Sequence, residues 1–159
     1  MKIINPYNIV EVKDTLIFLA GPITNAPDWQ SDAMNFLSKS KKNIYVASPR
    51  RNLKEPDDLI KQVEWETYYL NKAAEKGVIL FWLAKPSKLD SSRCYGQTTR
   101  YEIGEWIKSN KIFGTKIVLG IEKGFGNESY IEYRVKKETK IKINYDLKTT
   151  CKEALSLIG

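Results

Sequence analysis

Short apolar runs alternate with amphipathic segments along most of the chain. Residues 16–20 and 78–83 are continuous apolar runs, and the second is the most hydrophobic in the sequence. Runs of this kind are typical of strands that are buried on both faces of a parallel sheet. Further β-rich segments lie at residues 44–47, 116–120 and 141–143. The pattern therefore predicts five strands.

Between these runs, apolar residues recur at helical spacing. Residues 29–40 show this period, and Asp28 stands where the N-cap of a helix is expected. The same spacing predicts helices over residues 59–74, 98–110 and 147–157. Each predicted helix lies between two predicted strands or follows the last one.

The alternation of strands and helices predicts an α/β protein. Such a series favours an open parallel sheet with helices on both faces. We expect a flavodoxin-like (Rossmann-like) three-layer fold with a five-stranded parallel sheet, and residues 8–12, which alternate apolar and polar side chains, could add an edge strand. With 159 residues, of which 42% are hydrophobic, the chain suits a single domain over residues 1–159.

Histidine is absent from the sequence, and the two cysteines, Cys94 and Cys151, lie far apart. This composition excludes Ser-His and Cys-His catalytic arrangements, and it contains neither a zinc-ligand spacing nor a disulfide framework. The sequence also lacks a Walker A loop and a G-x-G-x-x-G motif. We therefore expect no metal and no cofactor, and any reaction is left to carboxylates, Lys, Tyr, Ser and Thr.

The net charge is +7, but the lysines are scattered along the chain. We interpret them as a solvated surface rather than as a site for a nucleic acid polymer. No apolar run approaches the roughly 18 residues that a membrane helix needs, and the first residues lack the apolar stretch of a signal peptide. The sequence thus predicts a cytoplasmic protein with small-molecule partners and no membrane partner.

Ligands of open α/β sheets bind beyond the carboxyl ends of the strands. Gly21 and Pro22 follow the first of these ends, and Gly21 either lets a ligand approach the backbone or simply forms a turn. We expect Glu102 to lie in the first turn of the helix after residues 78–83, where the helix dipole stabilises a carboxylate. An ionised carboxylate there can act as a nucleophile. The alternative is an ordinary glutamate at a helix start.

Four sequence blocks occupy about the first three quarters of the chain. They read L-I-F-L-A-G-P-I at 16–23, Q-V-E-W-E at 62–66, I-L-F-W-L at 79–83 and T-T-R-Y-E-I-G at 98–104. In this order the blocks resemble the nucleoside 2-deoxyribosyltransferase family. The resemblance implies transfer of 2-deoxyribose between nucleobases, with Glu102 attacking C1′ of the sugar. The alternatives are a hydrolase of nucleosides or their 5′-monophosphates that uses the same glutamate, and a nucleotide-binding module without turnover.

The resemblance also implies an acid that assists the departing base, several positions before Glu102. Gly96 stands at that place, and Asp90 is the nearest acid in the same loop. Glu66 could reach a sugar hydroxyl or the base, whereas aromatic residues near the site are either base contacts or core. The predicted substrate-binding residues are Gly21, Pro22, Glu66, Trp82, Asp90 and Tyr101.

Four arginines, Arg50, Arg51, Arg93 and Arg100, bear on the choice of substrate. A guanidinium is suited to a phosphate, so their convergence would indicate a nucleotide. Related hydrolases tend to place a phosphate-binding nest in the loop after the first strand, but residues 22–28 contain no Lys or Arg, which favours an unphosphorylated nucleoside. Members of the family usually form oligomers. We therefore expect a homo-oligomer, and residues 127–130 are where a contribution to a neighbour's pocket would be sought.

Overall fold

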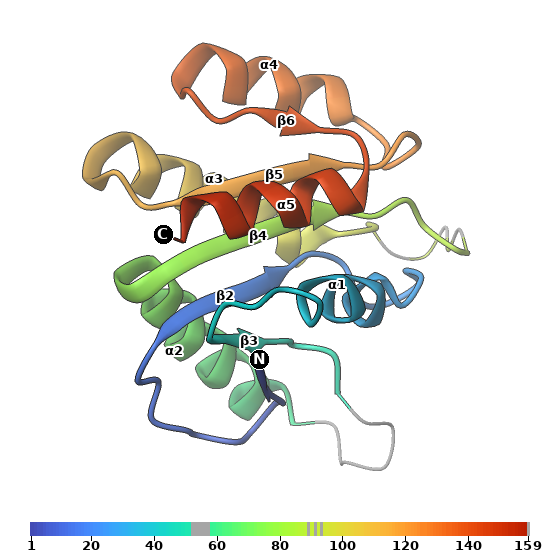
Figure 1. Ribbon diagram of the computed structural model, residues 1–159. Coiled ribbons are helices and arrows are strands. Elements are labelled where there is room, and N and C mark those ends of the chain that lie inside the picture. The colour runs from blue at the N-terminus through green and yellow to red at the C-terminus, as the bar shows by residue number, and fades with distance from the viewer. Residues whose placement is uncertain (52–57, 89, 91, 93, 159) are drawn as a thin grey trace.

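Strands and helices alternate along the chain in the computed structural model (Figure 1), which describes residues 1–51, 58–88, 90, 92 and 94–158. The elements are β1 (Lys2–Ile4), β2 (Thr15–Ala20), α1 (Trp29–Leu37), β3 (Ile44–Ala47), α2 (Leu59–Lys76), β4 (Gly77–Leu83), α3 (Gln97–Phe113), β5 (Ile117–Ile121), α4 (Glu128–Glu138), β6 (Ile143–Asn144) and α5 (Leu147–Leu157). Asp28 caps α1 as predicted, because its carboxylate accepts a hydrogen bond from the backbone nitrogen of Ser31.

All pairs of neighbouring strands in the sheet are parallel, and the strand order is β1-β3-β2-β4-β5-β6. Without β1, this order is the one that flavodoxin-like folds share. The prediction of a flavodoxin-like α/β fold is confirmed. Because the strands are parallel, their carboxyl ends all lie at one edge of the sheet, where the loops to α1, α2 and α3 begin.

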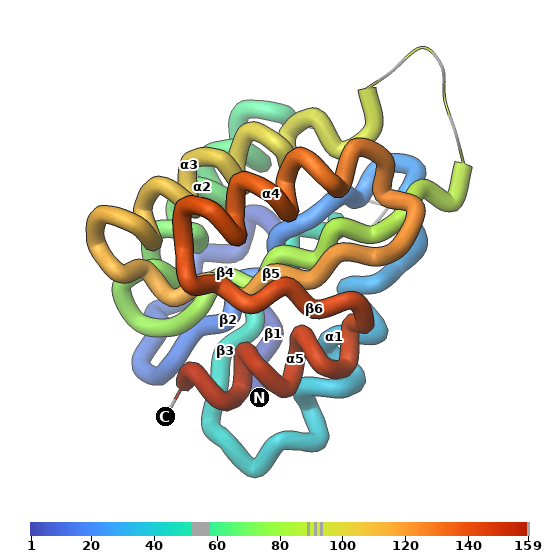
Figure 2. The backbone as a smooth tube through the Cα atoms, turned by 90° about the horizontal axis from the view of Figure 1, so that it is seen from above, coloured from blue at the N-terminus to red at the C-terminus, as the bar shows by residue number. Residues whose placement is uncertain are grey.

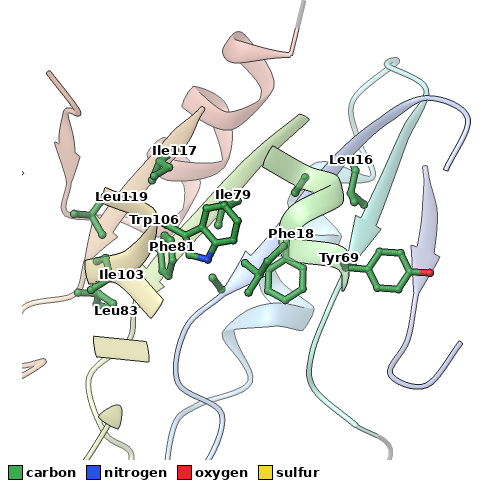
Figure 3. Packing of buried hydrophobic residues seen from close by; sticks show 14 of the residues in the cluster. Leu16, Phe18, Tyr69, Ile79, Phe81, Leu83, Ile103, Trp106, Ile117 and Leu119 are labelled. Atoms are coloured by element: carbon green, nitrogen blue, oxygen red, sulfur yellow. The ribbon is translucent and has the colours of Figure 1, made fainter. Parts of the chain in front are cut away.

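The strands are covered by helices on both faces, with α2, α3 and α4 on one side and α1 and α5 on the other (Figure 2). Successive residues of a strand point to opposite faces, so Phe18 packs under α2 whereas Ile17 belongs to the α1 and α5 side. Figure 3 shows the first of these cores, in which Tyr69 of α2 and Trp106 of α3 pack over the central strands. This double burial explains the continuous apolar runs of β2 and β4.

The sheet has six strands rather than the predicted five, and its extra edge strand is β1, not residues 8–12. Residues 8–12 bind side chains of α2 instead of pairing as a strand. The Asn8 carbonyl accepts hydrogen bonds from Trp65 Nε1 and Tyr69 Oη, both at 3.0 Å, and the Val10 nitrogen donates to Tyr69 Oη at 2.8 Å. Among the apolar residues of this segment, Val12 is buried, at 5% exposed, whereas Ile9 and Val10 are exposed.

Helix α4 was not predicted from the sequence. It buries only Ile131 and Val135, so its apolar stripe is too narrow to produce a clear helical pattern. Residues 127–130, the predicted place of a contribution to a neighbour's pocket, form the start of this helix, and Tyr130 is exposed there. Assembly into an oligomer stays a prediction. Over the described residues, no helix is long and apolar enough to cross a membrane.

Gly120 allows β5 to pack closely against α5 and β4. A Cβ atom at this position would lie 2.3 Å from Thr150 Oγ1 and 2.4 Å from the ring of Trp82. We expect Gly120→Ala to lower the free energy of unfolding by about 1–3 kcal/mol, because these groups would have to shift. Urea unfolding followed by circular dichroism measures the change.

Gly104→Ala is the matched control for this substitution. Nothing lies within 4 Å of a Cβ atom added at Gly104, which is within α3. Alanine is the better helix former by about 1 kcal/mol, so this variant should be at least as stable as the wild type. Equal stability of the Gly120→Ala variant and the wild type would contradict the packing argument.

Candidate active site

Glu102 lies on α3 near the carboxyl edge of the sheet, on the face that α2 also covers. The helix begins at Gln97, so Glu102 stands in its second turn and not in the first turn as predicted. The next residue in sequence, Ile103, is buried in the core beneath α3, as Figure 3 shows. The packing of this helix therefore holds the Glu102 backbone in place.

Glu102 is not held as a carboxylate by the helix dipole. The pKa of its side chain is raised from 4.5 to about 8. Burial is the largest cause of this shift, and the charges of the nearby Glu66 and Glu105 contribute to it. The influence of a helix dipole falls off within the first turn, so desolvation prevails at this position. This shift favours the protonated side chain of Glu102, whereas the sequence predicted a carboxylate stabilised by the helix dipole.

Glu66, on α2, is the second carboxyl of this site. Burial raises its pKa as well, but a hydrogen bond from Gln62 and the charge of Arg51 act in the opposite direction. The charge of Glu66 is in turn one of the causes that raise the pKa of Glu102. Both acids therefore hold a proton to higher pH than isolated glutamates do.

Gln62 is a member of the site that sequence reasoning did not single out. Its Nε2 donates to Glu66 Oε1 at 2.5 Å and to the Pro49 carbonyl at 2.9 Å. The Pro49 carbonyl can only accept, which fixes the orientation of the amide. Among the described residues, the remaining Oε1 of Gln62 is buried without a hydrogen-bond partner. The i, i+4 spacing of Gln62 and Glu66 on a predicted helix could have indicated that their side chains are in contact.

Gly21, Pro22 and Trp82 form a packed junction with Trp29. Gly21 has a φ of 155°, and an added Cβ would lie 2.3 Å from the Trp82 carbonyl and 2.7 Å from the Trp29 ring. The Trp29 indole donates to the Pro22 carbonyl at 2.9 Å. Trp82 is 4% exposed, in the core under α1 and α5, on the opposite face from Glu102. Protein packing thus accounts for the glycine, and contact of these residues with a substrate stays a prediction.

The loop between β4 and α3 places its residues differently from the family-based expectation. Asp90 is exposed and accepts hydrogen bonds from the nitrogen and the hydroxyl of Ser92, at 2.9 and 2.6 Å. Gly96 has a φ of 65° and lies under the Phe125 ring, 3.2 Å from an added Cβ. Tyr101 is 76% exposed. Asp90 is the only acid in the sequence of this loop, so the loop brings no buried acid to the site.

The described arginines are held by separate parts of the chain. Arg50 donates to the Pro27 carbonyl at 2.9 Å and forms an ion pair with Asp28. Arg100 donates to the Gly126 carbonyl at 2.8 Å and stacks over the Phe125 ring. Arg51 donates to Tyr7 Oη at 3.4 Å and lies close enough to Glu66 to lower its pKa, whereas Arg93 lies outside the described residues.

A hollow of about 540 Å³ lies at the opposite edge of the sheet, where β2, β4 and β5 begin. Its lining includes Thr15, Gly77, Phe113 and Lys116. None of the predicted site residues contributes to it, and it faces the ends of α2 and α3 that are farthest from their first turns. The Glu66 and Glu102 side chains therefore lie outside this hollow.

Protonation of Glu102 should make stability depend on pH. The folded protein binds this proton more tightly than the unfolded chain, so the free energy of unfolding should fall as pH rises from about 4.5 to about 8. Glu102→Gln cannot ionise, so its stability should fall less between pH 5 and pH 8, by about 1 kcal/mol or more relative to the wild type.

Urea unfolding at both pH values measures this difference. Glu64→Gln is the matched control, because Glu64 is an exposed glutamate on α2, and its variant should keep the pH dependence of the wild type. The same pH dependence in the wild type and in Glu102→Gln would show that the Glu102 side chain titrates normally.

One of the comparisons with known proteins identifies a family. A family model described as "Nucleoside 2-deoxyribosyltransferase like" matches residues 14–120, a range that contains both Glu66 and Glu102. A search of curated proteins found no match. The matched range covers more than half of the chain and includes strands β2 to β4 with the helices between them. The protein belongs to the nucleoside 2-deoxyribosyltransferase-like family.

Proposed function

We propose that this protein is a nucleoside 2-deoxyribosyltransferase, which cleaves the N-glycosidic bond of a deoxynucleoside and transfers the sugar to another nucleobase. The observation that carries the proposal is the pair of partly buried carboxyls, Glu66 and Glu102, near the carboxyl edge of the sheet. Glu102 also occupies the block, residues 98–104, in which the family resemblance places the nucleophile. Family membership supports nucleosides as the substrate class.

Glu102 acts as the nucleophile in this mechanism. One of its carboxylate oxygens attacks C1′ while the bond from C1′ to the base nitrogen breaks, through a transition state with oxocarbenium character. The product is a glycosyl ester of Glu102 and a free base. A second base then attacks C1′ and displaces the carboxylate, and two successive displacements return the original anomer.

The protonated resting state of Glu102 fits this role only if the proton leaves before the attack. The neighbouring Glu66 can accept it, because a carboxyl that acts electrostatically on Glu102 lies close to it. Positive charge that develops on the sugar next to Glu102 favours its ionised form. Substrate binding thus creates the nucleophile where it is needed, and the proton stays within the site.

The substrate in this proposal is an unphosphorylated nucleoside. Arg50 and Arg100 already bind the protein's own carbonyls, and the ion pair of Arg50 with Asp28 further offsets its charge. Residues 22–28 contain no cationic side chain. These observations favour a neutral sugar over a 5′-phosphate, and the active form in the proposal is a homo-oligomer.

A chromatographic assay of deoxynucleosides with a competing free base tests the proposal. We expect the wild type to form a new nucleoside, and Glu102→Ala to lower this rate by about 10³-fold or more, because the covalent route is lost. Glu64→Gln is the matched control, since Glu64 is an exposed glutamate on α2 and its variant should support wild-type exchange. Circular dichroism checks that all variants are folded.

Two other outcomes would replace the proposal. Free sugar without base exchange would identify a hydrolase that uses the same glutamate with water as acceptor. Binding of nucleosides without any product, unchanged in Glu102→Gln, would identify a nucleotide-binding module.

A further inference from the structure

The indole nitrogen of Trp106 is a buried hydrogen-bond donor without an acceptor in the described part of the chain. The Trp106 side chain is 7% exposed and packs in the core under α2 and α3. Burial of an N–H group without an acceptor costs free energy, so native proteins seldom contain one without a functional or structural reason. By contrast, the indoles of Trp29 and Trp65 each donate to a backbone carbonyl.

The Trp106 indole faces the turn of α3 that carries Glu102. Residues four apart on an α-helix are neighbours, with about 5–6 Å between their Cβ atoms. A long helical side chain leans toward the N-terminus of its helix, over the preceding turn. Figure 3 shows the Trp106 nitrogen on the side of the ring toward Leu83, the last residue of β4, and away from Ile117, the first residue of β5. The donor therefore points to the carboxyl edge of the sheet, where Glu102 lies.

The Glu102 carboxyl in turn lacks a hydrogen-bond donor among the described residues, although its side chain is partly buried. The charged groups that act on it are Glu66 of α2 and Glu105 of α3, and both disfavour its ionisation. An ionised Glu102 thus depends on a neutral donor. Of the buried donors without a partner in the described part of the chain, only Trp106 lies on this helix.

We propose that Trp106 is the positioning residue of Glu102, because its indole N–H donates a hydrogen bond to the Glu102 carboxylate once that group ionises. The catalytic consequence of this inference rests on the proposed function. The core fixes the indole ring, whereas rotation about the side-chain bonds of Glu102 brings the carboxylate to it. One oxygen then accepts from Trp106, and the other is left for attack on C1′. A hydrogen bond to a charged acceptor is stronger than one between neutral groups, so the bond favours the ionised form.

An NMR titration of the indole N–H groups tests this bond in the ligand-free protein. The chain has four tryptophans, so the Trp106 signal is one of four and is assigned through its neighbours in sequence. We expect its proton resonance to move downfield as pH rises through the titration of Glu102, near pH 8, and to stay in place in Glu102→Gln. The Trp29 and Trp65 indoles are internal references, because their acceptors do not titrate.

The pH profile of kcat/KM distinguishes a positioning role from a purely structural one. Loss of the donor raises the pKa of Glu102 in the free enzyme by about one pH unit, so the rising limb of the profile should move to higher pH in Trp106→Phe. The loss of rate should be about tenfold at pH 7 and smaller at higher pH. Ile103→Val is the matched control, because it removes volume from the same core and keeps the indole. Its rising limb should stay at the wild-type pH.

A Trp106 indole signal that does not respond to pH in the wild type, or that moves equally in Glu102→Gln, would overturn the inference. A loss of rate in Trp106→Phe that is the same at every pH would also overturn it, because a structural residue lowers the rate without moving the titration. Absence of base exchange in the wild type would instead overturn the proposed function. The indole titration would still decide whether Trp106 binds Glu102.

Discussion

Parallel pairing of β2 with β4 is the constraint on which the candidate site depends. These two strands lie at the centre of the sheet, and their carboxyl ends open into the loops that lead to α1 and α3. Since β3 runs in the same direction beside β2, the segment that leads to α2 begins at the same edge. Residues that are 36 positions apart in sequence, Glu66 and Glu102, are thereby carried to neighbouring places on one face of the sheet.

The same packing that brings the two carboxyls together also makes them costly to ionise. Trp65 and Tyr69 flank Glu66 along α2, and Ile103 and Trp106 follow Glu102 on α3, so the apolar core reaches almost to the acids. Burial is accordingly the largest cause of the raised pKa at both glutamates. Acids with raised pKa values lower the stability of the folded chain at neutral pH. Such a cost is typical of functional sites, where a group is selected for reactivity rather than for stability.

The part of the chain beyond residue 120 completes the fold without belonging to the matched family range. Helix α5 provides Cys151 and Ala154 to the core beneath β4, and its Thr150 lies against Gly120. Strand β6 extends the sheet beside β5, and α4 covers the face that carries α2 and α3. The sheet therefore depends on this segment for part of its second layer of helices, although Glu66 and Glu102 both lie before it.

The sequence by itself determined the parallel α/β architecture, because continuous apolar runs such as residues 78–83 are required where a strand is covered on both faces. It also identified Glu102 and Glu66 as candidates. Local patterns could not determine the edge strand β1, which has only three residues, or α4, which buries only two. The partial burial of Glu102 and the hydrogen bonds of Gln62 to Glu66 and Pro49 were decided by tertiary structure alone. Desolvation and hydrogen bonding depend on which segments pack together in the folded chain. The sequence of one segment does not show which other segments contact it.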